Sequence, residues 1–134
     1  MSIRDKCQLS LHNLQKALNH LNDALQLDQK EKIVIYGTIQ CFEIAIELYW
    51  KTLKRLLESE GIIANSPKQT LREAYAAHMI TDEATWLQML NDRNLTSHIY
   101  DESTALRIYN NIKTNFPVLE KTFHTLQLRF DELS

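Results

Sequence analysis

The segment EKIVIYGTIQCFEIAIELYWKTLKRLLES, residues 31–59, decides how this chain folds. Its opening, Lys32–Tyr36, would by itself suit a buried strand. The continuation favours a helix, because no turn signal interrupts it and its apolar residues recur at steps of three and four over about six turns. We therefore predict one long helix across this segment. The residues that keep this spacing are Ile35, Ile39, Phe42, Ile46, Tyr49, Leu53 and Leu56.

The only two glycines of the chain fall within and just after this predicted helix. A glycine inside a helix costs about 1 kcal/mol relative to alanine. Gly37 therefore either marks a close approach of another helix or is simply tolerated. Gly61 follows the last periodic residues and suits the C-terminal cap.

Two flanking segments, residues 5–27 and 101–130, carry the same helical period. Pro117 lies inside the second of them and should kink that helix or remove one of its backbone hydrogen bonds. The predicted inward-facing residues are Leu11, Leu14, Leu18, Leu21 and Leu25 in the first segment, and Leu106, Tyr109, Ile112, Phe116, Leu119, Phe123, Leu126 and Phe130 in the second.

Two shorter helices are predicted between the long ones. Ser66 can cap a helix that begins at Pro67 and reaches about residue 78, since proline is favoured at the first helical position. Residues 81–83, Thr-Asp-Glu, open the other with two acidic side chains; this helix carries Trp86 and continues into residues 93–100.

The composition agrees with an all-helical chain. Only two glycines and two prolines occur in 134 residues, whereas a turn-rich sandwich or barrel needs more of both. An apolar fraction of 44% and a charged fraction of 24% are typical of a globular protein. We predict a single domain over residues 1–134 that is all-α: an up-and-down helical bundle of about five helices, three long and two short.

Charge and cysteine usage restrict the functional classes. The formal net charge of −2 gives no global basic field, so any contact with nucleic acid must be local or pooled across a dimer. Cys7 and Cys41 lie in predicted helices without a C-x-x-C spacing, which indicates free thiols in a reducing compartment. The N-terminus lacks an apolar signal core and we expect no membrane-spanning window, which predicts a cytoplasmic protein without a membrane partner.

Residues 93–101, RNLTSHIYD, concentrate the chemistry of the chain where the helical pattern breaks. The guanidinium of Arg93 fits a phosphate group, and the imidazole of His98 can carry a proton near neutral pH. The spacing alone is weak evidence. In the alternative interpretation Arg93 pairs with a neighbouring carboxylate, and His98 caps a helix or packs against it.

Residues 93–102 resemble the R-x4-H-x-Y motif of HEPN-domain proteins, in the branch called nucleotidyltransferase substrate-binding proteins or HepT-like toxins. Three other stretches support this resemblance: residues 37–54, the run from Ser66 to Ala74, and Trp86-Leu87. The resemblance covers roughly residues 37–101 well and the flanking helices only by pattern. It implies a HEPN-like fold.

The resemblance also implies a metal-independent endoribonuclease that acts as a toxin on RNA, with a small nucleotidyltransferase as its antitoxin and no DNA substrate. RNA cleavage through the 2′-hydroxyl needs a base, an acid and a cation for the phosphorane. Arg93 could hold the phosphate, and His98 could be base or acid but not both at once. We therefore expect a homodimer through the motif-bearing face, which brings two copies of the motif together.

The residues near Arg93 and His98 either support the chemistry of the site or have purely structural roles. Asn94 could bind phosphate, orient His98 or cap the helix, and Asp101 should cap the last helix. Tyr100 could stack on a base or contact phosphate, or be an ordinary half-buried tyrosine; by resemblance it is the acceptor of the nucleotidyl group. The added negative charge would then repel RNA.

Glu43 and Glu47 are one helical turn apart in an otherwise apolar segment. Arg93 or Lys51 could neutralise Glu47, or both glutamates could belong to a solvated stripe. A further set of cations forms either a basic rim or ordinary surface: Lys51, Lys54, Arg55, Lys68 and Arg72.

No metal and no cofactor are expected, because the other histidines lack a paired ligand spacing and there is no glycine-rich phosphate loop. The chain would thus be the partner or target of a nucleotidyltransferase rather than that enzyme. Two alternatives remain open beside the ribonuclease. One is a non-catalytic substrate-binding adaptor that docks a nucleotidyltransferase, and the other is a dimeric helical adaptor in which the motif is structural.

Overall fold

The computed structural model describes residues 1–98 and 101–133. Over these residues the chain is helical and no strand occurs, so the predicted all-α class is confirmed. The helices are α1 (Ile3–Leu25), α2 (Lys32–Ser59), α3 (Pro67–Ala76), α4 (Glu83–Leu95), the short 3-10 helix η1 (Thr96–His98) and α5 (Glu102–Glu132).

The helix ends follow local rules that the sequence shows. Ser66 accepts a hydrogen bond from the Gln69 backbone N–H and caps α3, with Pro67 in its first turn. Asp82 caps α4 by accepting a hydrogen bond from the Thr85 backbone N–H, and Glu83 is the acidic residue of its first turn, where acidic residues were predicted. Gly61 has φ of 85° just after α2, and the next amide donates back to the Leu57 carbonyl, so the predicted glycine cap is confirmed as a Schellman turn.

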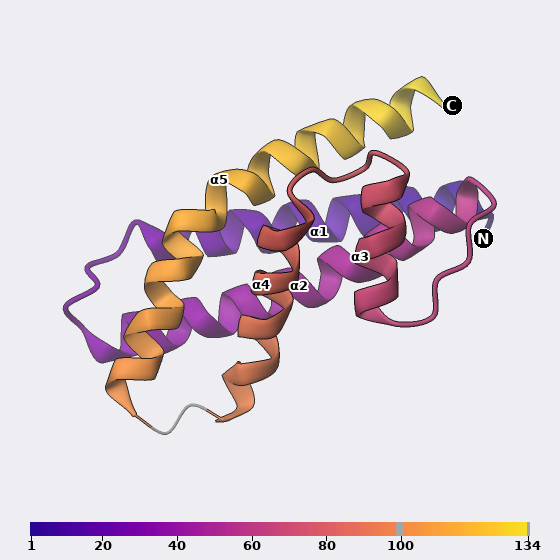
Figure 1. Cartoon of the computed structure of the whole chain (residues 1–134). Coiled ribbons are helices and arrows are strands. Elements are labelled where there is room, and N and C mark those ends of the chain that lie inside the picture. Colours follow the sequence, from indigo (N-terminus) through magenta and orange to yellow (C-terminus); the bar gives the residue numbers. More distant parts are fainter. Residues whose placement is uncertain (99–100, 134) are drawn as a thin grey trace.

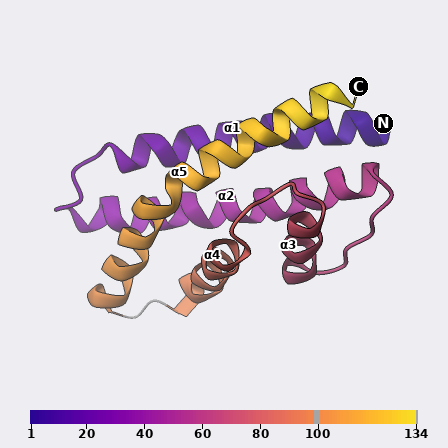
Figure 2. The ribbon, with the colours of Figure 1, turned by 45° about the horizontal axis from the view of Figure 1, so that its top comes forward.

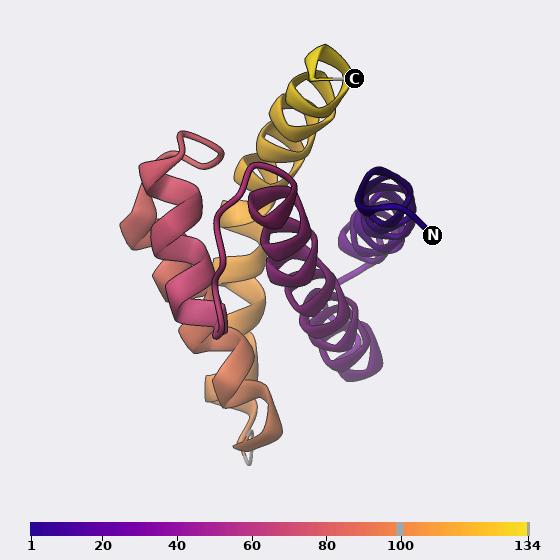
Figure 3. The ribbon, with the colours of Figure 1, turned by 90° about the vertical axis from the view of Figure 1, so that its right-hand side faces the viewer.

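Helix α2 is central to the bundle. Figures 1 and 2 show α1 and α2 side by side and antiparallel, with α5 crossing both. Figure 3 shows α1 on one side of α2 and the short helices α3 and α4 on the other. All four other α-helices contact α2. The long apolar segment around residues 31–59 thus forms the shared wall of the core.

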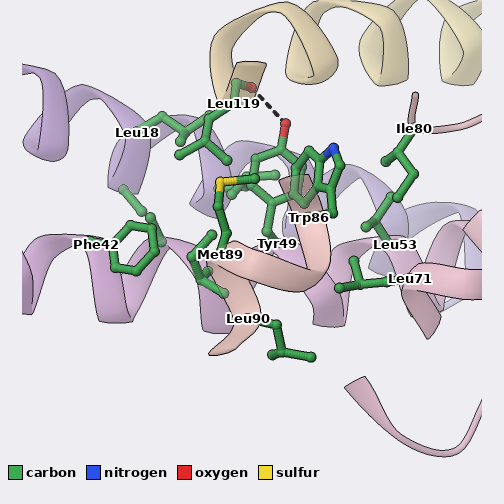
Figure 4. Close-up of a cluster of buried hydrophobic side chains, with 14 of the residues drawn as sticks. Leu18, Phe42, Tyr49, Leu53, Leu71, Ile80, Trp86, Met89, Leu90 and Leu119 are labelled. Carbon is green, nitrogen blue, oxygen red and sulfur yellow. Dashed lines mark hydrogen bonds between the residues drawn. The ribbon is translucent and has the colours of Figure 1, made fainter. Parts of the chain in front are cut away.

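The core fixes α4 against α2 and α5 (Figure 4). Trp86 of α4 is buried and meets the ring of Tyr49 edge-on, with centroids 4.8 Å apart. The Tyr49 hydroxyl donates a 2.7 Å hydrogen bond to the backbone carbonyl of Leu119 in α5. Burial raises the pKa of this hydroxyl well above its usual value. Met89 is buried in the same cluster, one turn before Arg93, so the core determines where that arginine lies.

Most of the predicted apolar faces are buried, and the exceptions have a simple cause. Leu106 was expected in the core but is 44% exposed, because the inward face at the start of α5 is centred on Ala105 and Ile108. Leu25, Ile35, Phe123 and Phe130 are only partly buried.

The structure also refines three expectations about single helices. Residues 102–132 form one continuous helix around Pro117, and Figures 1 and 2 show its axis bending about half-way along, as expected for an internal proline. The fourth helix ends at Leu95, earlier than predicted. Among the residues that the structure describes, no other segment comes within 4 Å of a Cβ built on Gly37, so none of the described helices approaches closely there.

One expectation about membranes needs correction. By length and hydropathy alone, α2 is apolar enough to cross a membrane, although no such segment was expected. The core helix of a globular bundle passes the same test, and ten α2 residues are buried in this fold.

Candidate functional site

The last turn of α4 places Arg93 over the middle of α2. Its Nε donates a 3.2 Å hydrogen bond to Oε2 of Glu47, and both side chains are about one third exposed, at 28% and 34%. Lys51, one turn further along α2, lies 3.6 Å from the other carboxylate oxygen. Glu47 therefore meets both cations that the sequence suggested, and the interpretation of Glu47 as part of a purely solvated stripe is wrong.

The charges around Glu47 determine its protonation. Partial burial would raise the pKa of this carboxyl, but nearby donors and cations outweigh it and the pKa is lowered. The Trp50 indole N–H contributes by proximity, although it makes no hydrogen bond of ordinary geometry, and the charges of Arg93 and Lys51 add to it. Glu47 therefore keeps its negative charge to a lower pH than an ordinary glutamate.

Glu43, one turn before Glu47 on α2, contacts the residue that directly follows α4. The Thr96 hydroxyl bonds to the Glu43 carboxylate and also lies 2.7 Å from the Arg93 carbonyl. These contacts pin the first residue of η1 to α2 directly after α4 ends. Thr96 is a site residue that sequence reasoning missed, because nothing in a single threonine distinguishes a tertiary contact from a surface position.

A shallow groove of about 240 Å³ lies where the end of α4 meets α2. Within the described part of the chain, the two terminal nitrogens of Arg93 make no hydrogen bond. Because Glu47 holds only Nε, the outer edge of the guanidinium remains available for the bidentate binding of a phosphate. The groove is lined by Glu43, Ile44, Glu47, Leu48 and Arg93.

His98 ends η1 and is exposed, as is Asn94 on α4. Neither lines the groove, and no hydrogen bond joins either side chain to Arg93 over residues 1–98 and 101–133. The structure therefore brings Arg93 together with the two glutamates, whereas His98 is exposed and lies outside the groove. Tyr100 lies outside the described residues.

Asp101 has a structural position at the start of α5. Its carboxylate accepts hydrogen bonds from the Thr104 amide at 2.7 Å and the Ser103 hydroxyl at 3.1 Å. The Thr104 and Ser103 bonds lower its pKa. The predicted N-cap is confirmed, and these contacts account for the carboxylate without a role in the groove.

Asp92, next to Arg93, faces inward. It is 3% exposed, and Asn111 of α5 donates a 3.1 Å hydrogen bond to it. Burial raises the pKa of Asp92, against the opposing effects of Asn111 and the Arg107 charge. This buried acid ties the site-bearing end of α4 to α5.

The cations of the predicted basic rim do not all lie together. Of the predicted basic rim, Lys51, Lys54 and Arg55 line one groove, whereas Lys68 and Arg72 lie outside it on α3. In the part of the chain that the structure describes, no three metal-ligating side chains of the His, Cys, Asp or Glu type form a group.

The all-helical bundle of α1 to α5 places the chain in the HEPN-like class of helical proteins. Residues 9–128 match the family described as "Nucleotidyltransferase substrate binding protein like". The chain belongs to this family.

A relative of similar length agrees with this assignment. The chain is 33% identical over 129 residues to a protein of Haemophilus influenzae named "Probable ribonuclease HepT", covering 90% of this chain and 87% of that one.

Solved structures show the same fold. A Thermus thermophilus protein has a TM-score of 0.74 at 30% identity, covering 87% of this chain and 98% of its own. A Haemophilus influenzae protein has a TM-score of 0.66 at 27% identity, covering 92% and 98%. That structure is described as revealing the fold of a substrate-binding domain of a nucleotidyltransferase.

Proposed function

We propose that this protein is a metal-independent endoribonuclease of the cytoplasm and the toxin of a pair whose antitoxin is a small nucleotidyltransferase. The observation that carries the proposal is the guanidinium of Arg93, which Glu47 fixes through Nε in a residue that lines an open groove. The relative named as a probable ribonuclease supports the same activity.

The proposed chemistry uses the 2′-hydroxyl of the RNA as nucleophile. A base removes its proton, the oxygen attacks the adjacent phosphorus, and the bond to the 5′-oxygen breaks as an acid protonates that oxygen. Arg93 stabilises the charge on the phosphorane oxygens. His98 supplies one of the two proton transfers, because a neutral imidazole accepts a proton and an imidazolium donates one.

The second proton carrier comes from a second copy of the chain in this proposal. An apolar stripe on the outer face of α2 supports a dimer, with Ile33 78%, Tyr36 42% and Ile44 50% exposed. Gly37 lies within this stripe with open space above it, where another helix can approach closely. Ile44 also lines the Arg93 groove, so a copy seated on the stripe would bring its own motif to the site.

Tyr100 is the proposed point of control. Its phenolic oxygen would attack the α-phosphate of a nucleoside triphosphate bound by the partner, pyrophosphate would leave, and the phenol proton would pass to a base. The product is a phosphodiester two residues from His98 in the chain. Its negative charge would compete with RNA for the cation of Arg93.

Cleavage of a labelled RNA by the purified protein in the presence of a chelator tests the activity. We expect His98→Ala to lower the rate by about 100-fold or more, because general acid–base catalysis contributes that much. His124→Ala, which removes an exposed histidine of α5, is the matched control and should cleave at the normal rate. Equal cleavage by both variants would contradict the role of His98.

The alternative is a non-catalytic subunit that docks a nucleotidyltransferase. The solved relative described as a substrate-binding domain favours it. In that case the purified protein would leave RNA intact and co-purify with the transferase when both are expressed.

A further inference from the structure

A second groove, of about 330 Å³, lies between the start of α1 and the second half of α2. Four of its lining residues are basic and one is acidic, although the chain as a whole has a net charge of −2. Its lining residues are Lys6, Trp50, Lys51, Lys54, Arg55 and Glu58.

The cations in this groove come from two helices that are tied together there. Nη1 of Arg55 donates a 3.4 Å hydrogen bond to the backbone carbonyl of Lys6. The side chain of Lys6 is exposed and that of Lys54 is half-buried. Such an arrangement holds several positive charges at fixed separations, which suits a ligand with repeated negative charges.

Trp50 adds an aromatic surface to the same groove. The Lys51 ammonium lies 6.0 Å from the centroid of its ring. The indole nitrogen is buried, so the polar edge of the ring is turned away from solvent. Grooves that combine cations with aromatic rings are typical of sites for single-stranded nucleic acid, where phosphates meet the cations and bases stack on the rings.

The basic groove and the Arg93 groove are lined by successive parts of α2, residues 50–58 and residues 43–48. Lys51 joins them, because it lines the basic groove and also pairs with Glu47, which holds Arg93. At the helical rise per residue, Lys54 lies about 10 Å along α2 from Glu47. A strand of a few nucleotides can span that distance.

We infer that the basic groove binds the phosphates of a single-stranded RNA whose scissile phosphate lies at Arg93. The inference rests on the proposed ribonuclease function for the class of ligand and adds where the strand runs. In this inference Lys6 and Lys54 bind the RNA substrate and take no part in bond cleavage.

RNA binding, measured without cleavage, tests this inference. The probe is a fluorescent single-stranded RNA of about a dozen nucleotides, titrated by anisotropy at several salt concentrations with the full chain carrying His98→Ala. The test variant adds Lys6→Gln and Lys54→Gln. The matched control adds Lys113→Gln and Lys121→Gln, which remove two exposed lysines of α5 outside both grooves.

We expect the test variant to bind RNA about tenfold more weakly than the control, and the slope of log affinity against log salt to fall by about 1.4, which corresponds to two lost phosphate contacts. Both variants should melt at the same temperature, since all four side chains lie at the surface or near it. Equal affinities and slopes would overturn the inference.

The outcomes separate this inference from the proposed function. If the wild-type protein cuts RNA but the two variants bind it equally, the ribonuclease stands and the groove assignment is wrong. If no cleavage occurs but binding depends on Lys6 and Lys54, the groove assignment stands and the catalytic proposal is wrong.

Discussion

At the scale of single residues, the pairing of Arg93 with Glu47 fixes the direction of the guanidinium. Nε is held at 3.2 Å, and the site therefore presents a fixed cation to the groove. A free arginine would lose more side-chain entropy on binding phosphate than one already oriented.

Replacement of this carboxylate should reveal the pairing as a pH-dependent stability. We expect Glu47→Gln to lower the free energy of unfolding by about 0.5–1 kcal/mol near pH 7, the range for a partly exposed ion pair. The pKa of Glu47 is lowered in the folded state, so this stabilisation is present above the unfolded pKa of about 4.3 and is lost as the pH falls through the folded pKa.

Urea unfolding at about pH 7 and about pH 3 measures the difference. Glu120→Gln, at an exposed position of α5, is the control and should change stability little at either pH. A loss for Glu47→Gln that is the same at both pH values would show that the pairing does not stabilise the fold.

The buried acid beside Arg93 should behave in the opposite way. The pKa of Asp92 is raised in the folded state, so the stability that it contributes is present below its unfolded pKa and is lost as the pH rises through the folded value. Asp92→Asn keeps an acceptor for Asn111 without the charge. We expect its melting temperature to equal or exceed that of the wild type near pH 7, with any advantage shrinking towards about pH 4. A clear loss of stability at neutral pH would show that the charge itself is needed.

At the scale of elements, the outer face of α2 is the feature that a single chain does not explain. Over residues 1–98 and 101–133, no other segment lies within 4 Å of a Cβ built on Gly37, yet a glycine there weakens the helix. If a second copy approaches there, the same glycine is required for the contact.

A substitution at this position should therefore separate folding from association. We expect Gly37→Ala to stabilise the monomer by up to about 1 kcal/mol and to weaken the dimer. Gly61→Ala is the contrasting variant, because its φ of 85° makes a side chain strained, so it should destabilise the fold and leave dimer contacts alone. Sedimentation at several concentrations and urea unfolding measure the two effects. A dimer that is unaffected by Gly37→Ala would place the interface elsewhere.

The elements also show how far local sequence determines this fold. The long helices, the start of α3 at Pro67 and the glycine turn after α2 follow from periodicity and capping, which act within a few residues. The end of α4 at Leu95 could not be predicted, since no glycine or proline marks it. It depends on Thr96, which bonds to Glu43 across the fold.

The candidate site could likewise be predicted only in part from the sequence. The pair of Arg93 with Glu47 could be proposed, because two glutamates on an apolar helix require a cation nearby. The burial of Asp92 could not, because its partner Asn111 lies on another helix and an aspartate in sequence looks like an exposed one.

At the scale of the whole molecule, one chain supplies only part of what the proposed ribonuclease reaction requires. It has an oriented phosphate cation and one exposed imidazole, whereas the proposed reaction needs two proton transfers. The exposed stripe on α2 and the free position of His98 both suit a second copy. The central claim is therefore that two chains share each cleavage site.

Subunit mixing tests this claim most directly. Wild-type protein and His98→Ala protein are mixed at constant total concentration, allowed to exchange subunits, and assayed for RNA cleavage. If both imidazoles are needed, activity falls as the square of the wild-type fraction, to about one quarter in an equal mixture. A linear fall, to about one half in that mixture, would show that each chain cleaves on its own and would contradict the shared site.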